Sequence, residues 1–243
     1  MKVLFLGTGA ADWSGPDENG EYRRLTSTLL DGRLLIDVTR SAIGSIKDLA
    51  AITDVFYTHS HNDHFDLEAL KALSPCHVWA HESWAGEIEG SGLTVTPLRI
   101  GETVTAAGFS VTPLPSNHST SRKYETTLHY LIEKDGKRLL YATDGAWLLN
   151  YEYHFIRTFK LDAAVFDATI GDGHDGDYRV FEHNSLPMLR IMVSTLRNTG
   201  ILKPDAPVFM THLARTLHGT QAEVEKCAEP PFIVCFDGLE VEF

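Results

Sequence analysis

The segment at positions 58–65, with the sequence THSHNDHF, places three histidines and one aspartate close together. His59 and His61 are two positions apart, so an extended backbone directs both imidazole rings to the same side. Asp63 and His64 follow in the turn, where they can face the same point. Imidazole and carboxylate groups are ligands for Zn²⁺, and also for Mn²⁺ or Fe²⁺. The segment therefore predicts a metal site, and the alternative is a polar loop of solvated histidines.

Predicted secondary structure places this segment between a strand at 54–58 and a helix at 65–73 whose apolar residues have helical spacing. The clearest hairpin joins strands at 126–133 and 138–142. Further strands are expected at 2–6, 28–30, 34–38, 77–80, 94–98, 103–105, 109–114, 163–167, 208–210, 232–236 and 239–243, the last two joined by an Asp237-Gly238 turn, and further helices at 40–49, 81–87, 147–158, 184–198 and 221–228. This order predicts one domain, residues 1–243, with two sheets flanked by helices.

The composition of the 243 residues is that of a soluble globular protein, with 43% hydrophobic and 22% charged residues. A formal charge of −12 disfavours general nucleic-acid binding, but it permits a small anionic substrate held by metal ions. The three cysteines form no CxxC pair, which indicates a reducing compartment. The sequence also lacks a long apolar run and the pattern of a signal peptide, so we expect a cytoplasmic protein without a membrane segment.

The HxHxDH motif resembles that of the metallo-β-lactamase superfamily, and the opening LGTG loop and later residues fit the same pattern over essentially the whole chain. The resemblance implies an α/β fold, a four-layer αββα sandwich with two mixed β-sheets flanked by helices. In that family the first two histidines of the motif bind one metal ion and the Asp-His pair binds a second. A third histidine, a bridging aspartate and a late histidine complete the site.

The resemblance assigns those three roles to His118, Asp144 and His212, each of which follows an apolar predicted strand. It implies two divalent ions, with Zn²⁺ expected first and Mn²⁺ or Fe²⁺ as alternatives. The ligands of the first ion would be His59, His61 and His118, those of the second ion Asp63, His64 and His212, and Asp144 would bridge the two.

Two later elements resemble the tRNA 3′-processing endonucleases and the phosphoribosyl cyclic phosphodiesterases of the superfamily. They are the VFDAT stretch around Asp167, with Asp in place of Glu, and the EHNS stretch around His183. In those enzymes the histidine protonates the leaving oxygen, and a neighbouring carboxylate that favours imidazolium suits this role. Asp63, Asp167 and His183 are therefore the expected catalytic residues. The alternatives are a strand-end cap for Asp167 and a residue at a helix N-terminus for His183.

Four further residues are expected to contact substrate. His218 follows the last ligand at a position where phosphodiesterase relatives often carry a histidine. The loop at 12–24 should overhang the site, so that Trp13 could stack on a ring while Arg23 and Arg24 hold phosphate. The alternative is that these are solvated loop residues.

The expected function is hydrolysis of a small phosphodiester, cyclic ones included, by a metal-activated water with His183 as general acid. The chain lacks a basic arm for tRNA, and the loop at 171–177 carries Asp172, Asp175 and Asp177, which would repel a polyanion. One alternative is a thioester, lactone or lactam hydrolase on the same dinuclear site, and another is a metal-dependent binding protein without turnover. A homodimer is compatible with the sequence, and the expected partner is a small anionic molecule.

Overall fold

The computed structural model describes residues 1–73, 75–88, 92–174 and 176–243, and its strands form two seven-stranded sheets. The first sheet has the order β14-β1-β2-β3-β4-β5-β6, from β14 (Glu240–Glu242), β1 (Lys2–Gly7), β2 (Ser27–Leu30), β3 (Leu34–Ile36), β4 (Asp54–Phe56), β5 (His77–His81) and β6 (Thr94–Leu98). The second has the order β13-β12-β11-β10-β9-β8-β7, from β13 (Phe232–Val234), β12 (Val208–Thr211), β11 (Ala163–Asp167), β10 (Lys137–Ala142), β9 (Leu128–Lys134), β8 (Phe109–Pro115) and β7 (Val104–Ala106). Both contain parallel and antiparallel pairs, so both sheets are mixed as predicted.

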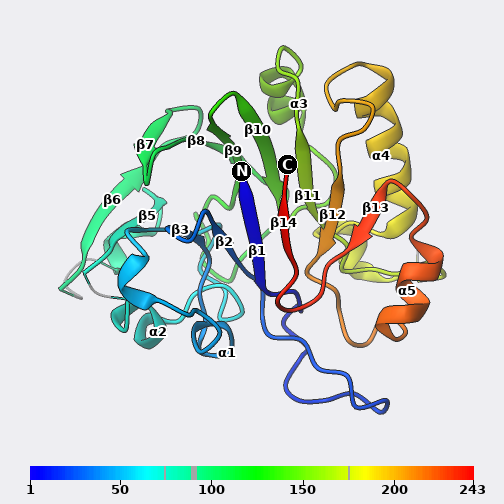
Figure 1. Ribbon diagram of the computed structural model, residues 1–243, viewed down its shortest axis with the longest axis horizontal. Helices are drawn as coiled ribbons and strands as arrows, with labels where there is room; N and C mark the ends of the chain where they lie inside the picture. The colour runs from blue at the N-terminus through cyan, green and yellow to red at the C-terminus, as the bar shows by residue number, and fades with distance from the viewer. Residues whose placement is uncertain (74, 89–91, 175) are drawn as a thin grey trace.

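The helices cover the outer faces of the two sheets (Figure 1). They are α1 (Arg40–Ile43), α2 (Leu67–Lys71), α3 (Asn150–Ile156), α4 (Leu186–Asn198) and α5 (Gln221–Cys227), with 3-10 turns at Leu49–Ala51, Ala85–Glu87 and Tyr178–Phe181. One apolar core lies between the sheets and includes Phe5 and Phe209. A second joins α1 and α2 to the first sheet, and a third joins α3, α4 and α5 to the second sheet. The predicted four-layer αββα sandwich is therefore confirmed.

Local sequence explains the most regular elements. Leu189, Met192, Val193 and Leu196 recur at helical spacing and are the buried face of α4, whose N-terminus is capped by the Ser185 hydroxyl. The β9–β10 hairpin turns at Asp135-Gly136, where both residues have positive φ, the backbone of a two-residue turn.

The predicted pairing of the last two strands is wrong. β13 lies parallel to β12 in the second sheet, and β14 pairs antiparallel with β1 in the first, so the Asp237-Gly238 turn carries the chain from one sheet to the other. The reason is the Asp237 carboxylate, which accepts hydrogen bonds from the backbone and hydroxyl of Thr8 and from the backbone of Arg24. These contacts hold the turn at the end of β1.

Several predicted helices are shorter than expected. The helix expected at 40–49 ends at Ile43, and that expected at 147–158 covers only Asn150–Ile156. The segment 81–87 is not a helix, because His81 is the last residue of β5 and only a 3-10 turn follows. No helix in the described part of the chain has the length and hydrophobicity that crossing a bilayer requires.

Strand direction brings the predicted site residues to one edge of the sandwich. In the first sheet β1, β3 and β4 run the same way, and in the second β8, β10, β11 and β12 do so. The two edges meet where Leu213, after β12, donates its backbone N–H to Thr8 and accepts one from Ala10. Residues that follow these strands therefore lie together.

The backbone of Gly7, at the end of β1, is packed closely against the backbone of residues 24–25 beneath this edge. A Cβ at Gly7 would lie 2.0 Å from the carbonyl oxygen of Leu25 and 2.9 Å from that of Arg24, whereas one at Gly15 would have no neighbour within 4 Å. Gly7→Ala should therefore lower the free energy of unfolding by about 1–3 kcal/mol, the usual cost of overpacking. Urea denaturation followed by circular dichroism measures this, with Gly15→Ala as the control. Equal midpoints for the two variants would contradict the packing described.

Candidate metal centre

The first three predicted ligands meet at the end of β4. A tight turn, in which the backbone of Phe65 donates to the carbonyl of His61, folds the HxHxDH segment back on itself. His59 Nε2 lies 3.0 Å from His61 Nδ1, and His118 Nε2, from the loop after β8, lies 3.2 Å from the same His61 atom. Three nitrogens from two sheets thus face one point, in a group whose ligand atoms could hold one ion.

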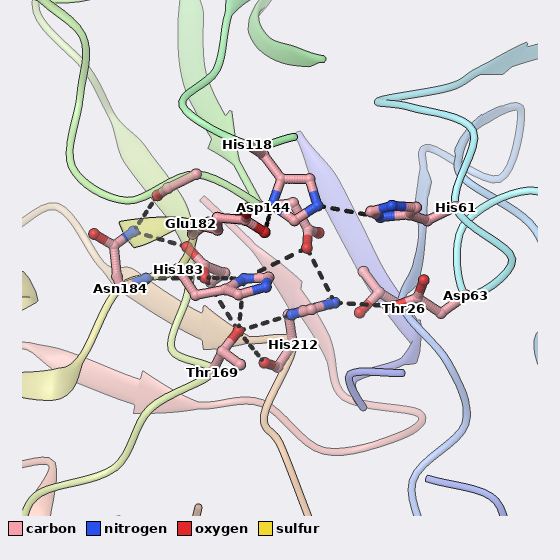
Figure 2. Close-up of polar contacts among 12 residues, drawn as sticks. Thr26, His61, Asp63, His118, Asp144, Thr169, Glu182, His183, Asn184 and His212 are labelled. Atoms are coloured by element: carbon pink, nitrogen blue, oxygen red, sulfur yellow. Dashed lines mark hydrogen bonds and ion pairs between the residues drawn. The ribbon is translucent and has the colours of Figure 1, made fainter. Parts of the chain in front are cut away.

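A second group of ligand atoms lies beside the first. His212 Nε2 is 3.3 Å from Asp63 Oδ2, and His64 Nε2 is 3.6 Å from the same oxygen. Asp144 lies between the groups, with one carboxylate oxygen 3.0 Å from His64 Nε2 and the other 3.3 Å from His212 Nε2. Figure 2 shows the contact between Asp144 and His212. His59, His64 and Asp144 also form a group of metal-ligand spacing. The structure therefore brings together all seven predicted ligands.

The backbone is strained at two of these positions. Asp144 has φ 59° and His212 φ 56°, in the left-handed region that non-glycine residues seldom adopt. Each residue follows the end of a buried strand, and the left-handed turn redirects its side chain toward the other sheet. Strain of this kind is typical of functional sites, because it persists only where the surrounding structure holds it.

Hydrogen bonds on the outer nitrogen of four histidines determine which nitrogen is free for a metal. Each Nδ1 donates to an oxygen: His59 to the Thr58 hydroxyl, His64 to Asp37, His118 to the carbonyl of Glu182, and His212 to the Thr169 hydroxyl. In each ring this leaves the lone pair of Nε2 directed into the cluster, which is the arrangement of metal-ligating histidines.

Burial and charge also fit bound cations. Burial lowers the pKa of His118 to about 4 and holds that of His59 well below its usual range, so both rings are neutral ligands at pH 7. His64 is different: burial opposes its charged form, but Asp144, Asp37 and Asp63 outweigh burial and raise its pKa. The buried atoms His64 Nε2 and Asp144 Oδ2 face each other at 3.0 Å, but within the described residues neither has a hydrogen bond of suitable geometry. The cluster thus favours positive charge at its centre, which divalent ions would supply.

Sequence reasoning missed Asp37, which orients His64 from the side of the ring that faces away from the cluster. Its buried carboxylate accepts hydrogen bonds from His64 Nδ1 at 2.7 Å and from the backbone and hydroxyl of Thr58 at 2.8 Å. Asp37 also has positive φ, 55°. The available signal was a single aspartate inside the apolar run at 34–38, a pattern that a strand-end cap shares.

The structure places His183 beside Asp167, as the sequence predicted. His183 Nδ1 lies 3.2 Å from Asp167 Oδ2, and its ring stacks on His212 with centroids 5.4 Å apart. Burial opposes the charged imidazole, but the hydrogen bond to Asp167 and the charge of Asp144 outweigh burial and raise the pKa of His183. Asn184, which sequence reasoning did not assign, fixes Asp167 by donating its backbone N–H and its side-chain amide to the two carboxylate oxygens.

Sequence reasoning also missed His129 and Glu152, a buried pair that supports the loop that carries Asp144. His129 Nδ1 lies 2.6 Å from Glu152 Oε1, and both side chains are buried. The other edge of the His129 ring packs so closely under Gly145 that a Cβ there would lie 2.7 Å from the ring. In sequence, His129 is an ordinary polar position within a predicted strand, and nothing distinguishes it.

A cavity of about 240 Å³ opens over the cluster. Among the predicted residues it is lined by His61, Asp63, His118, Asp144, His183 and His212. Its wall also contains Asp12, Tyr178, Arg179 and Glu182, of which Tyr178 is 79% exposed. The cavity therefore suits a small molecule that reaches the cluster and His183 together.

The predicted substrate-binding residues make other contacts, and this part of the prediction is corrected. Trp13 is buried and its indole N–H donates to the carbonyl of Leu213. Arg23 is also buried and donates to Thr8, to the carbonyl of Cys235 and to Gln221. Arg24 donates to the carbonyl of Leu6 and pairs with Asp237, and His218 Nε2 donates to the carbonyl of Ala168. These four side chains hold the 12–24 loop and its surroundings together, and none of them lines the cavity.

The acidic loop at 171–177 is partly neutralised. Asp172 accepts two hydrogen bonds from the guanidinium of Arg190, and Asp177 accepts two from the guanidinium of Arg179. Asp175 lies outside the described residues. Repulsion of a polyanion by this loop is therefore weaker than its sequence indicates.

The comparisons with known proteins agree with this geometry. A family model described as a beta-lactamase superfamily domain matches residues 23–203. The comparison with curated proteins gives no match.

Among solved structures, the metallo-beta-lactamase fold protein YhfI from Bacillus subtilis is 15% identical, with a TM-score of 0.76 over 100% of this chain and 99% of its own. Zn²⁺-bound PqqB from Methylobacterium extorquens is 20% identical, with a TM-score of 0.76 over 100% of both chains. A diphosphatase from the PhnP family is 18% identical, with a TM-score of 0.71 over 100% of this chain and 97% of its own. At these identities the similarity shows the fold. Since the family model covers most of the chain, this protein belongs to the beta-lactamase superfamily.

Proposed function

We propose that this protein is a hydrolase that uses two divalent ions to cleave a small phosphodiester, cyclic ones included. The observation that carries the proposal is the His183–Asp167 pair, because its histidine lines the same cavity as the candidate metal ligands and Asp167 is buried behind it. The solved diphosphatase of the PhnP family supports phosphorus chemistry on this fold. A charge of −12 and a cavity of about 240 Å³ favour a small substrate over a nucleic acid.

The proposed ligands of the first ion are His59, His61 and His118, those of the second ion Asp63, His64 and His212, and Asp144 would bridge them. Two cations bound there would polarise a phosphoryl oxygen and lower the pKa of a water molecule toward neutrality. We propose Zn²⁺, because imidazole and carboxylate ligands suit it and a protein of this fold is described as Zn²⁺-bound. Mn²⁺ and Fe²⁺ are the alternatives for the same ligands.

His183 would supply the proton for the leaving group. Its Nδ1 faces Asp167, so the opposite nitrogen, Nε2, faces away from that carboxylate, and the ring lines the cavity. The raised pKa of His183 favours the protonated ring, which is the form that a general acid needs. As the bond from phosphorus to the departing oxygen breaks, Nε2 donates this proton to the oxygen. Asp167 accepts the hydrogen bond from Nδ1 before, during and after this transfer, and so keeps the ring in one orientation.

Metal content tests the two-ion site. After incubation with Zn²⁺ and desalting, the protein should retain about two ions per chain, as in known dinuclear hydrolases. His61→Ala should reduce this number, because His61 Nδ1 lies at 3.0–3.2 Å from two other ligand nitrogens. Elemental analysis by mass spectrometry measures the ratio. His154→Ala removes an exposed histidine on α3 and should leave the ratio unchanged. Retention of only one ion by the unmodified protein would refute the dinuclear site.

Leaving-group dependence tests the acid role of His183. His183→Ala should lower kcat on a diester with an alcohol leaving group by roughly 10²–10⁴-fold, because an alkoxide must be protonated as it departs. The loss should be smaller for 4-nitrophenolate, which leaves without a proton. Asp167→Asn should show the same trend, and His154→Ala should show no loss.

The same variant separates the rival chemistry. A thioester, lactone or lactam hydrolase would cleave its preferred substrate nearly as well with His183→Ala as without the substitution. An equal loss for both diester leaving groups, with metal content intact, would contradict proton donation by His183.

A further inference from the structure

The charged wall of the cavity includes Glu182, a side chain to which the proposed reaction gives no role. It precedes His183 in the chain, its carboxylate is 45% exposed, and it accepts a hydrogen bond of 2.6 Å from the Ser119 hydroxyl. The carboxylate also lies 3.9 Å from Nδ1 of His118, on the side of that ring opposite the candidate metal position. Figure 2 shows Glu182 beside His118 and Asp144. Glu182 is therefore a fixed negative charge next to the site.

The rest of the cavity wall contributes little positive charge that could offset the charge of Glu182. Among the described residues, Arg179 is the only arginine or lysine that lines the cavity. Its Nε and Nη2 donate to the Asp177 carboxylate, and its Nη1 donates to the Thr216 hydroxyl. Asp12 adds a second carboxylate, which accepts hydrogen bonds from the backbone of Arg215 and Thr216. Apart from the proposed cations and the His183 ring, the charged groups of the cavity wall are neutral as a pair, as in Arg179 and Asp177, or negative.

We propose that Glu182 makes the site selective for substrates with a single negative charge, located on the reacting phosphodiester, whose other substituents are neutral or cationic. This inference rests on the proposed function, since it names the substrate class of the same site. A phosphomonoester, or a diester with a further anionic group, brings a second negative charge toward Glu182 and Asp12. Because Glu182 is 45% exposed, salt and water screen part of this repulsion, but at short range the remainder discriminates between ligands of equal size.

Three 4-nitrophenyl phosphodiesters test the proposal. They share the leaving group, and the second ester group carries an ammonium, no charge or a carboxylate. The Zn²⁺-loaded protein should cleave the carboxylate compound with the lowest kcat/KM. Glu182→Gln keeps an oxygen for Ser119 and should raise the ratio of the carboxylate to the ammonium compound by roughly three- to ten-fold, as removal of one charge at several ångströms predicts. The gain should shrink at high salt.

Glu242→Gln is the matched control, because it removes the same charge from β14, opposite Lys2 and far from the cavity end of β1. An unchanged ratio in Glu182→Gln, or an equal change in Glu242→Gln, overturns the proposal. Metal content equal to that of the unmodified protein shows that the variant retains the site.

A binding measurement separates this proposal from the proposed function. If the unmodified protein cleaves none of the diesters, the phosphodiesterase function fails, and calorimetry with dimethyl phosphate and methyl phosphate at pH 8 decides the role of Glu182. Methyl phosphate is a dianion at that pH and dimethyl phosphate a monoanion. Glu182→Gln should tighten binding of methyl phosphate more than that of dimethyl phosphate, by roughly three- to ten-fold. An equal effect on both ligands overturns the proposal.

Discussion

The structure depends on one electrostatic constraint, which is that acidic side chains are buried together where the two sheets meet. Asp37, Asp63, Asp144 and Asp167 are each 9% exposed or less. Charges taken out of water are costly unless they are paired and hydrogen-bonded. The protein meets this requirement with imidazoles from both sheets, with backbone and hydroxyl donors, and at the centre with positions that suit cations. Strand ends, turns and the two left-handed ligand residues all serve this arrangement.

The side chains at the site form two layers of contacts, an inner shell and an outer shell. The inner shell presents nitrogens and oxygens to the centre, and the outer shell fixes them in place. Asp37, Asn184 and the His129–Glu152 pair belong to the outer shell: each is buried, each bonds to or packs against a residue of the inner shell or its loop, and none lines the cavity. The candidate ligands and His183 are therefore held in place before anything binds, which is the property of a preorganised site.

The sequence predicted which side chains the fold brings together at the candidate metal centre better than it predicted their surroundings, for physical reasons. His59 and His61 are recognisable because their spacing and position after a buried strand are local properties. His118, Asp144 and His212 also follow apolar strands, so parallel strand ends explain their convergence. Trp13 and Arg23 were misplaced, because the direction of a loop side chain depends on distant partners such as Leu213 and Cys235. The last strands were misassigned for the same reason, since Asp237 binds Thr8, more than two hundred residues away in sequence.

The composition of each ligand group has a consequence for how the site can change. His59 and His61 come from the first sheet and His118 from the second, and the other group is divided in the same way. The space between the sheets is filled by side chains such as Phe5 and Phe209, whose rings are 5.5 Å apart. The thickness of this layer sets how far the ligands from the first sheet lie from those of the second sheet. Altered packing there would change the span within each ligand group, and hence how closely each group could surround an ion, while every ligand stays the same.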